Sequence, residues 1–89
     1  MSWWVYVLEC RDGTLYTGCT DDIPRRLAAH NAGRGAKYTR GRGPVTLRYR
    51  EETLDKPDAL RREAAIKRLS RTGKQALIDV YNKENKDEI

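Results

Sequence analysis

Two strand-like runs joined by a short turn constrain the fold of this chain more than any other feature. Residues 3–9 (WWVYVLE) and 15–20 (LYTGCT) are rich in aromatic and β-branched residues, which favour strands. The segment between them contains Asp12-Gly13, a common turn signal. We therefore predict an antiparallel β-hairpin near the N-terminus.

The length of the hairpin turn decides which side chains share a face, because successive residues of a strand point to opposite faces. A two-residue turn would place Tyr6 and Tyr16 on opposite faces of the sheet. A three-residue turn over residues 11–13, with Gly13 in the left-handed conformation, instead pairs Tyr6 with Gly18. We predict the three-residue turn, which puts both phenol groups on one face.

The rest of the chain alternates helical and strand patterns. Asp21 or Asp22 is the expected cap of the first helix, and Gly33 its stop. The expected elements are a helix to about residue 32, an edge strand over 45–53, a helix over about 56–70 and a short helix opened by a capping box at 72–75. With 89 residues there is room for one core, so we predict a single domain over residues 1–82 and a polar tail over 83–89.

Positive charge is concentrated in the first half of the chain. Residues 1–50 hold nine Lys/Arg and four Asp/Glu, whereas residues 51–89 hold nine of each. The stretch 33–43 (GRGAKYTRGRG) combines four basic residues with four glycines and no acid. Such a loop can follow a phosphate backbone, although a flexible solvated loop is an equal interpretation of this stretch alone. The basic residues predicted to contact nucleic acid are Arg25, Arg34, Lys37, Arg40, Arg42 and Lys67.

Several classes of protein are disfavoured. Cys10 and Cys19 fit no zinc spacing, and the predicted register points them to opposite faces, so we expect two reduced thiols. No apolar run approaches the ~20 residues of a membrane span. The N-terminus lacks the features of a secretory signal, and we therefore expect a cytoplasmic protein without membrane contact.

Three polar residues fall at positions suited to chemistry. Arg26 and His30 are four residues apart and should stack on one face of the first helix. Glu63 lies within the apolar stripe of the second helix, where a carboxylate is unexpected. A structural interpretation is also open for each: Arg26 could pair with Asp22, His30 could be a surface residue, and Glu63 could pair with Lys67 one turn later.

The ordered set of WVY at 4–6, YTG at 16–18, Arg26 with His30, and Glu63 resembles the GIY-YIG nuclease superfamily. The likeness covers about residues 3–81. The strings DIPRRLAAHN, GAKYTRGRGP and EAAIKRLSR are similar to small stand-alone bacterial proteins that resemble the nuclease subunit of structure-specific resolvases. Departures are Trp4, where the family name has glycine, and threonine inside YTG. The resemblance implies an α+β fold (an α/β sandwich), in which a three-stranded antiparallel sheet is flanked by about three helices.

The resemblance also implies a role for each residue in breaking a phosphodiester. Tyr6 is similar to the proposed general base, and Tyr16 to the residue that orients the attacking water or the phosphate. Arg26 would stabilise negative charge at phosphorus, and His30 would contact phosphate or relay a proton. Glu63 would be the only protein ligand of one divalent cation, Mg²⁺ or Mn²⁺. Because the pKa of a free tyrosine is about 10, Tyr6 would need nearby cations to lower it, and Arg26 and the metal are candidates.

The expected function is therefore that of a metal-dependent endonuclease that hydrolyses phosphodiester bonds in DNA, in repair or recombination. A non-catalytic nucleic-acid-binding module of the same fold is the alternative, and an accessory subunit that binds a protein partner is a third. Resolvase-type relatives work with a zinc-binding domain or partner, so a protein partner is expected to direct this chain to its substrate.

Overall fold

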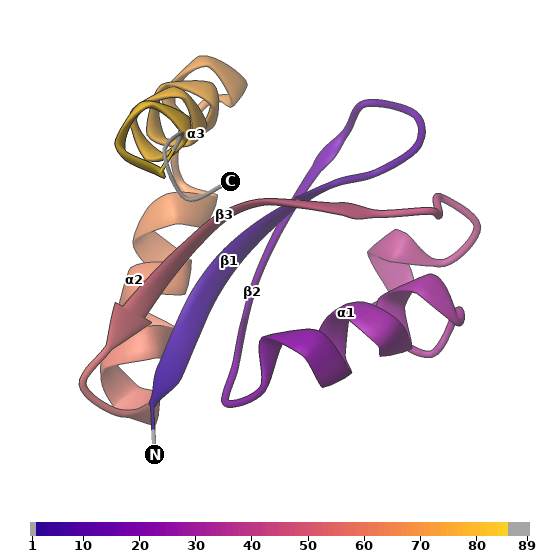
Figure 1. The fold of residues 1–89 in the computed structure, drawn as a ribbon, viewed down its shortest axis with the longest axis horizontal. Coiled ribbons are helices and arrows are strands. Elements are labelled where there is room, and N and C mark those ends of the chain that lie inside the picture. The colour runs from indigo at the N-terminus through magenta and orange to yellow at the C-terminus, as the bar shows by residue number, and fades with distance from the viewer. Residues whose placement is uncertain (1, 86–89) are drawn as a thin grey trace.

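The computed structural model of the protein describes residues 2–85. Its elements in chain order are β1 (Trp3–Glu9), β2 (Leu15–Thr20), α1 (Ile23–Asn31), the short 3₁₀ helix η1 (Lys37–Thr39), β3 (Thr46–Thr53), α2 (Lys56–Lys67) and α3 (Arg71–Asn85) (Figure 1). The strands form one antiparallel sheet in the order β2-β1-β3. The predicted α+β fold with a three-stranded sheet is confirmed, and β3 is an edge strand as expected.

The hairpin turn has the predicted length. Gly13 has a φ of 83°, in the left-handed region that favours glycine. Tyr6 pairs with Gly18, and Leu8 pairs with Tyr16. Because paired residues share a face of the sheet, both phenols lie on the same face.

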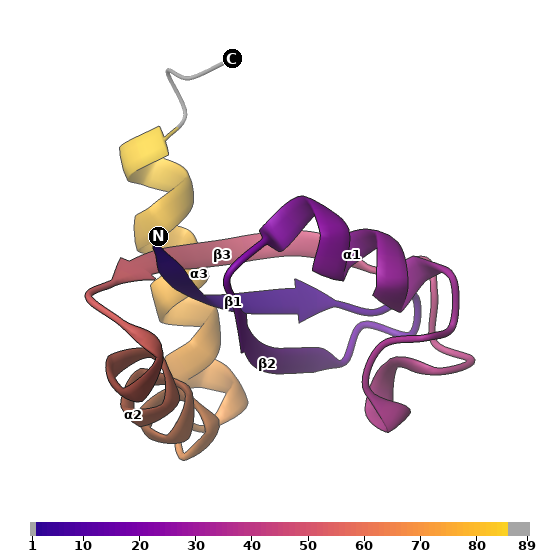
Figure 2. The same cartoon turned by 90° about the horizontal axis from the view of Figure 1, so that it is seen from below.

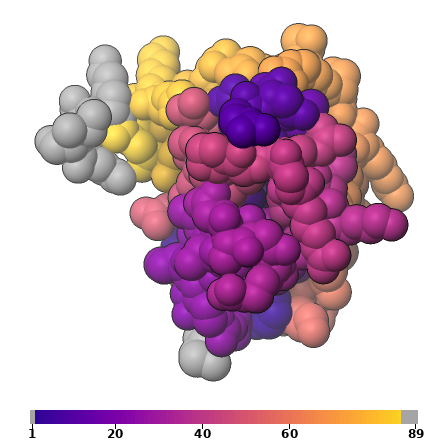
Figure 3. All heavy atoms as spheres, turned by 90° about the vertical axis from the view of Figure 1, so that its right-hand side faces the viewer, coloured from indigo at the N-terminus to yellow at the C-terminus, as the bar shows by residue number. Residues whose placement is uncertain are grey.

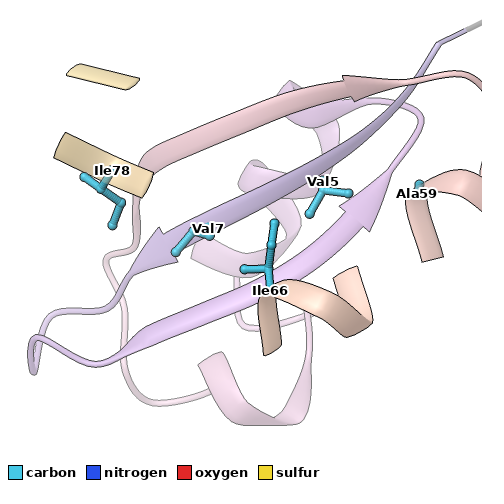
Figure 4. Close-up of a cluster of buried hydrophobic side chains, with 5 residues drawn as sticks. All are labelled: Val5, Val7, Ala59, Ile66 and Ile78. Carbon is cyan, nitrogen blue, oxygen red and sulfur yellow. The ribbon is translucent and has the colours of Figure 1, made fainter. Parts of the chain in front are cut away.

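The sheet separates two clusters of buried side chains. Helix α1 covers one face, and α2 covers the other (Figure 2). Val5 and Val7 of β1 pack against Ala59 and Ile66 of α2 and Ile78 of α3 (Figure 4). The alternate residues of β1 form the second cluster, on the α1 side, which comprises Tyr6, Leu8, Cys10 and Val45, with Leu27 of α1 packed against it. Tyr6 is therefore buried on the face of the sheet that α2 does not cover.

Helix α1 begins and ends close to the predicted residues. The Asp22 side chain caps it by accepting a hydrogen bond from the backbone N–H of Arg25 (3.1 Å). Pro24 lies in the first turn, where its missing N–H costs nothing. The helix ends at Asn31, and Gly33 follows with a φ of 78°.

The last two helices differ from the prediction at their junction and at the C-terminal end. Helix α2 ends at Lys67 rather than near residue 70. Ser70 accepts a hydrogen bond from the backbone N–H of Gly73 (3.1 Å), so the cap of α3 is Ser70 and not Thr72. Helix α3 then continues to Asn85, so a short third helix was the wrong prediction.

The added length of α3 takes in residues 83–85 of the predicted tail. Residues 86–89 of that tail lie outside the described residues, and a domain boundary at residue 82 stays a prediction. None of the helices within residues 2–85 has the length and apolar character to cross a membrane.

Candidate active site

A chain of buried hydrogen bonds joins β1, α1 and η1. The Tyr6 hydroxyl lies 3.0 Å from Nε2 of His30, and Nδ1 of His30 lies 2.8 Å from Oγ1 of Thr39. The Thr39 hydroxyl donates to the carbonyl of Ala36 (2.9 Å). Tyr6, His30 and Thr39 are each at most 3% exposed, and each of these buried polar groups has a protein partner.

The hydrogen-bond network determines which nitrogen of His30 carries the proton. Because the Thr39 hydroxyl gives its one proton to a carbonyl, it accepts from His30, and Nδ1 is the protonated nitrogen. Nε2 is then an acceptor for the Tyr6 hydroxyl. The opposite tautomer would leave the Tyr6 proton without an acceptor among the described residues, since the neighbouring Arg26 can only donate.

Burial shifts the pKa values of His30 and Tyr6 in the directions that favour their neutral forms. It lowers the pKa of His30, with a further lowering from the Arg26 guanidinium, so the imidazole is neutral at neutral pH. It raises the pKa of Tyr6 to about 12, and the opposing effect of Arg26 is smaller. Arg26 lowers the Tyr6 pKa, as a nearby cation is expected to do, but the loss of hydration outweighs it and the net pKa is raised.

Two glycines allow the side chains to approach this closely. A Cβ on Gly18 would lie 2.6 Å from the Tyr6 hydroxyl oxygen and 3.1 Å from the Tyr16 ring. A Cβ on Gly35 would overlap the ring of His30 and lie 2.8 Å from its Cα. Each glycine is thus required by the space around the site rather than by a left-handed backbone.

Tyr16 continues the site as a row of rings. Its ring centroid lies 6.5 Å from that of Tyr6 and 5.3 Å from that of His30. Its other neighbour is Tyr38 of η1, stacked at 5.8 Å. The basic loop that carries Tyr38 lies against the tip of the β1–β2 hairpin, where the Arg11 amide donates to the Arg42 carbonyl (2.8 Å) (Figure 3).

Arg26 projects from α1 towards the Tyr6 phenol. It lines a small enclosed hollow with Tyr6 and Leu8 of β1 and with the apolar residues of α1. The alternative pairing with Asp22 is not observed, because Arg25 takes Asp21 (3.3 Å) and Asp22 (4.0 Å) instead.

Glu63 lies on the other side of the sheet edge from the two tyrosines, Arg26 and His30. Helix α2 places it on the opposite face, with its side chain 16% exposed. Its Oε2 pairs with Nζ of Lys67 at 2.7 Å, which is the structural interpretation that the sequence left open. Burial and a hydrogen bond to Glu63 raise the pKa of the Cys19 thiol to about 11.

The two faces meet at Tyr16, on edge strand β2. Burial raises the pKa of Tyr16, while Lys67 lowers it and Glu63 raises it further. Their charges therefore reach the phenol from the other side of the strand. The structure brings Tyr6, Tyr16, Arg26 and His30 together and places Glu63 beside them across the β2 edge.

The Glu63 carboxylate can hold a hard cation such as Mg²⁺ weakly, on the condition that Lys67 gives way to it. Among residues 2–85, three or more His, Cys, Asp or Glu side chains do not gather anywhere in a metal-binding arrangement. Mg²⁺ often keeps several waters and takes one or two carboxylates together with substrate phosphates, so Glu63 alone can anchor it. Because Lys67 pairs with one carboxylate oxygen, its ammonium charge competes with a cation for Glu63.

The predicted nucleic-acid contacts divide into two groups. Arg34, Lys37 and Arg40 are exposed, and none takes part in an ion pair within the part of the chain that the structure describes. The other three are engaged: Arg25 with the α1 cap, Lys67 with Glu63, and Arg42 with Asp12 (2.7 Å).

Sequence reasoning missed Thr39, Gly35 and Tyr38, because it treated residues 33–43 as a flexible loop. His30 itself was the feature of the sequence that could have pointed to these residues. A histidine beside an apolar helix stripe becomes buried, and its ring nitrogens then need partners. In the GAKYT string that follows, the Thr39 hydroxyl is a candidate for such a partner, and Gly35 is a candidate for leaving space around the ring.

Comparisons with known proteins identify the family to which the chain is similar. The model of the GIY-YIG catalytic domain matches residues 2–76. A UPF0213 protein of Halobacterium salinarum is 64% identical over 73 residues, which is 82% of this chain and 95% of the relative. One from Streptococcus sanguinis is 56% identical, covering 84% and 86% of the two chains.

Two solved structures are also similar. The solution NMR structure of the UPF0213 protein BH0048 from Bacillus halodurans is 48% identical, with a TM-score of 0.58 over 90% of this chain and 85% of that one. The solution NMR structure of the protein EF2693 from E. faecalis is 39% identical, with a TM-score of 0.62 over 92% and 88%.

Proposed function

The chain belongs to the GIY-YIG nuclease family, and from this premise we propose that it is a divalent-metal-dependent endonuclease that hydrolyses phosphodiester bonds in DNA. The hydrogen bond from Tyr6 to the neutral His30 carries the proposal. A buried phenol with a base behind it can take a proton from water and pass its own proton on.

The proposed relay removes the difficulty of the high Tyr6 pKa. A free phenolate would be scarce at neutral pH with a pKa of about 12. If the phenol proton moves to Nε2 of His30 as the phenol oxygen accepts a proton from water, no free phenolate is required. Thr39 holds Nδ1 protonated throughout, so the ring presents the lone pair of Nε2 to the phenol.

The other residues act on the phosphate. Arg26, which lines the same hollow as Tyr6, would stabilise negative charge on phosphate oxygens close to that phenol. Tyr16, next to both His30 and the β2 edge, would orient the phosphate or the water. Glu63 would hold the cation, which supplies Lewis-acid stabilisation of the phosphate when bound.

One observation favours the second candidate, a non-catalytic nucleic-acid-binding module. The ion pair with Lys67 neutralises the only carboxylate proposed to hold the metal. If Lys67 did not yield to a cation, the protein would keep its basic loop and bind DNA without cleaving it.

Cleavage assays separate the two candidates. The protein is incubated with Mg²⁺ or Mn²⁺ and with duplex, single-stranded and branched DNA, beside Tyr6→Phe, Arg26→Ala and Glu63→Gln. Loss of the relay in Tyr6→Phe should lower the cleavage rate by about 10²- to 10⁴-fold. Tyr49→Phe is the matched control, because Tyr49 is half-buried and has a pKa of about 12, like Tyr6, but donates to Glu51 on β3.

Cleavage that survives all three substitutions would come from a contaminating nuclease and would defeat the proposal. Salt-sensitive binding without cleavage by the unsubstituted protein would instead support the binding module. A pull-down that recovers a partner, without cleavage or DNA binding, would support the accessory-subunit hypothesis.

A further inference from the structure

An open hollow lies between the hairpin, η1 and the first turn of α3. It is lined by Thr14 and Leu15 of the hairpin, Tyr38 of η1, and Arg71 and Lys74 of α3. Its volume is about 160 Å³, below the ~300–1,000 Å³ of sites for drug-sized ligands. The size suits one planar ring rather than a whole cofactor.

One wall of this hollow is an exposed and supported aromatic ring. Tyr38 is 42% exposed, and it stacks on Tyr16 at an interplanar angle of 26°. The guanidinium of Arg42 lies 4.6 Å from the Tyr38 ring centroid and is itself held by Asp12. Because Tyr16 and Arg42 both lie over this ring, a base that stacks on Tyr38 takes the place of one of them, and the partly exposed guanidinium of Arg42 is the group that it displaces.

The part of the hollow that α3 contributes is positively charged. Arg71 and Lys74 lie in the first turn of α3, where the helix dipole adds a partial positive charge. Neither is in an ion pair with a carboxylate among residues 2–85. An aromatic ring beside two cations is the kind of surface that binds single-stranded nucleic acid, since the base stacks and the phosphate pairs.

The hollow is close to the candidate active site. The ring centroids of Tyr38 and Tyr16 are 5.8 Å apart, so the hollow borders the candidate active site. A base held at Tyr38 would therefore belong to a nucleotide near the phosphate at Tyr16. A base inside a duplex has both faces covered by its neighbours and cannot stack on a protein ring.

We propose that this hollow binds an unpaired nucleotide of the DNA, with its base stacked on Tyr38 and its phosphate held by Arg71 and Lys74. The inference rests on the proposed function and specifies the substrate: DNA with a single-stranded segment beside the cleaved bond. The duplex part of such a substrate contacts the basic loop at Arg34, Lys37 and Arg40.

Binding measurements in EDTA test the inference without requiring cleavage. The probes are a fluorescein-labelled ten-nucleotide single strand, the same sequence as duplex, and a forked DNA with 2-aminopurine in its unpaired arm. Tyr38→Leu should weaken binding to the single strand by about tenfold and abolish the 2-aminopurine quenching that stacking produces. Tyr38→Phe keeps the ring and should remain within twofold of the unsubstituted protein on both probes.

Charge variants provide independent support that does not disturb the Tyr16 stack. Lys74→Gln should weaken single-strand binding and reduce the salt dependence by about 0.7 in log–log slope, as expected for one lost phosphate contact. Lys83→Gln is the matched control, because Lys83 lies in the last turn of the same helix. Its affinity and slope should be unchanged.

Equal losses on duplex and single strand for Tyr38→Leu, or unchanged quenching, would overturn the inference. So would tenfold tighter binding of RNA of the same sequence, which would point to a different substrate class. If the unsubstituted protein cleaves no DNA but the ring-dependent binding is observed, the nuclease proposal fails while the nucleotide site stands.

Discussion

Replacing Thr39 with valine tests the proton relay at its least obvious member. Valine keeps the shape of threonine but removes the hydroxyl that fixes the His30 tautomer. Thr39 is 1% exposed, so water cannot replace the lost partner, and the Nδ1 proton of His30 becomes an unsatisfied buried donor. Such a group costs about 1–3 kcal/mol, whereas the Ala36 carbonyl keeps its bond from the Thr39 amide (3.0 Å).

The same change should impair catalysis through the tautomer. Without its acceptor at Nδ1, His30 can move the proton to Nε2, and the Tyr6 hydroxyl then loses its acceptor. We expect cleavage to fall at least about tenfold, but less than in Tyr6→Phe, because the ring remains in place. Thr39→Ser is the matched control: it keeps the hydroxyl and loses one methyl group, worth about 0.8 kcal/mol.

Three measurements decide the outcome. Urea denaturation gives the change in stability, which for a domain of this size corresponds to a fall in Tm of about 4–8 °C per kcal/mol. Nitrogen-15 NMR of the imidazole reports the tautomer, and cleavage is measured at a temperature where both variants are folded. If the valine and serine variants show the same tautomer and the same rate, Thr39 has no positioning role and the relay is refuted.

The remaining predictions concern packing, pH and the metal. Gly35→Ala should destabilise the fold by about 1–3 kcal/mol in urea, because the added Cβ overlaps the His30 ring and backbone; unchanged stability would contradict the close approach. Thr17→Val should be neutral or stabilising, since the Thr17 hydroxyl is buried with no partner among the described residues; a loss above about 1 kcal/mol would reveal a partner. The lowered pKa of His30 means that stability is constant above its unfolded value of 6.5 and falls as the pH drops below it, a slope that calorimetry should find absent in a folded His30→Gln variant. Lys67→Met should tighten Mn²⁺ binding several-fold without DNA, as measured by electron paramagnetic resonance, because it removes the cation that competes for Glu63; weaker binding would mean that the pair does not oppose the metal.

Features set by neighbouring residues were predictable from the sequence. The hairpin register depends on one glycine in a three-residue turn and on the period of two, both of which can be read locally. The position of Glu63 on the inward face of α2 follows from helical spacing alone. These local rules placed the two tyrosines and the glutamate correctly on their faces.

Features that depend on distant contacts were not predictable in the same way. His30 meets Tyr6 across 24 residues and Thr39 across nine, and neither spacing carries a periodic signal. The length of α3 depends on contacts too. Tyr81 packs on Tyr49 with ring centroids 5.6 Å apart, and the Asn85 side chain donates to the Tyr81 carbonyl (2.8 Å), which holds the last turn.

The position of β2 at the edge of the sheet would allow residues on two faces to act on one phosphate in the proposed reaction. Alternate side chains of β2 project to opposite faces, so Tyr16 joins Tyr6 on the α1 side while Cys19 meets Glu63 on the α2 side. In a central strand the neighbouring strands would keep these groups apart. At an edge both sets border the same open margin, and the charges of Glu63 and Lys67 act on the Tyr16 phenol across it. A DNA strand lying along that margin would reach the Tyr16 phenol from one side and the Glu63 carboxylate from the other, so the proposed chemistry would need no deep cleft.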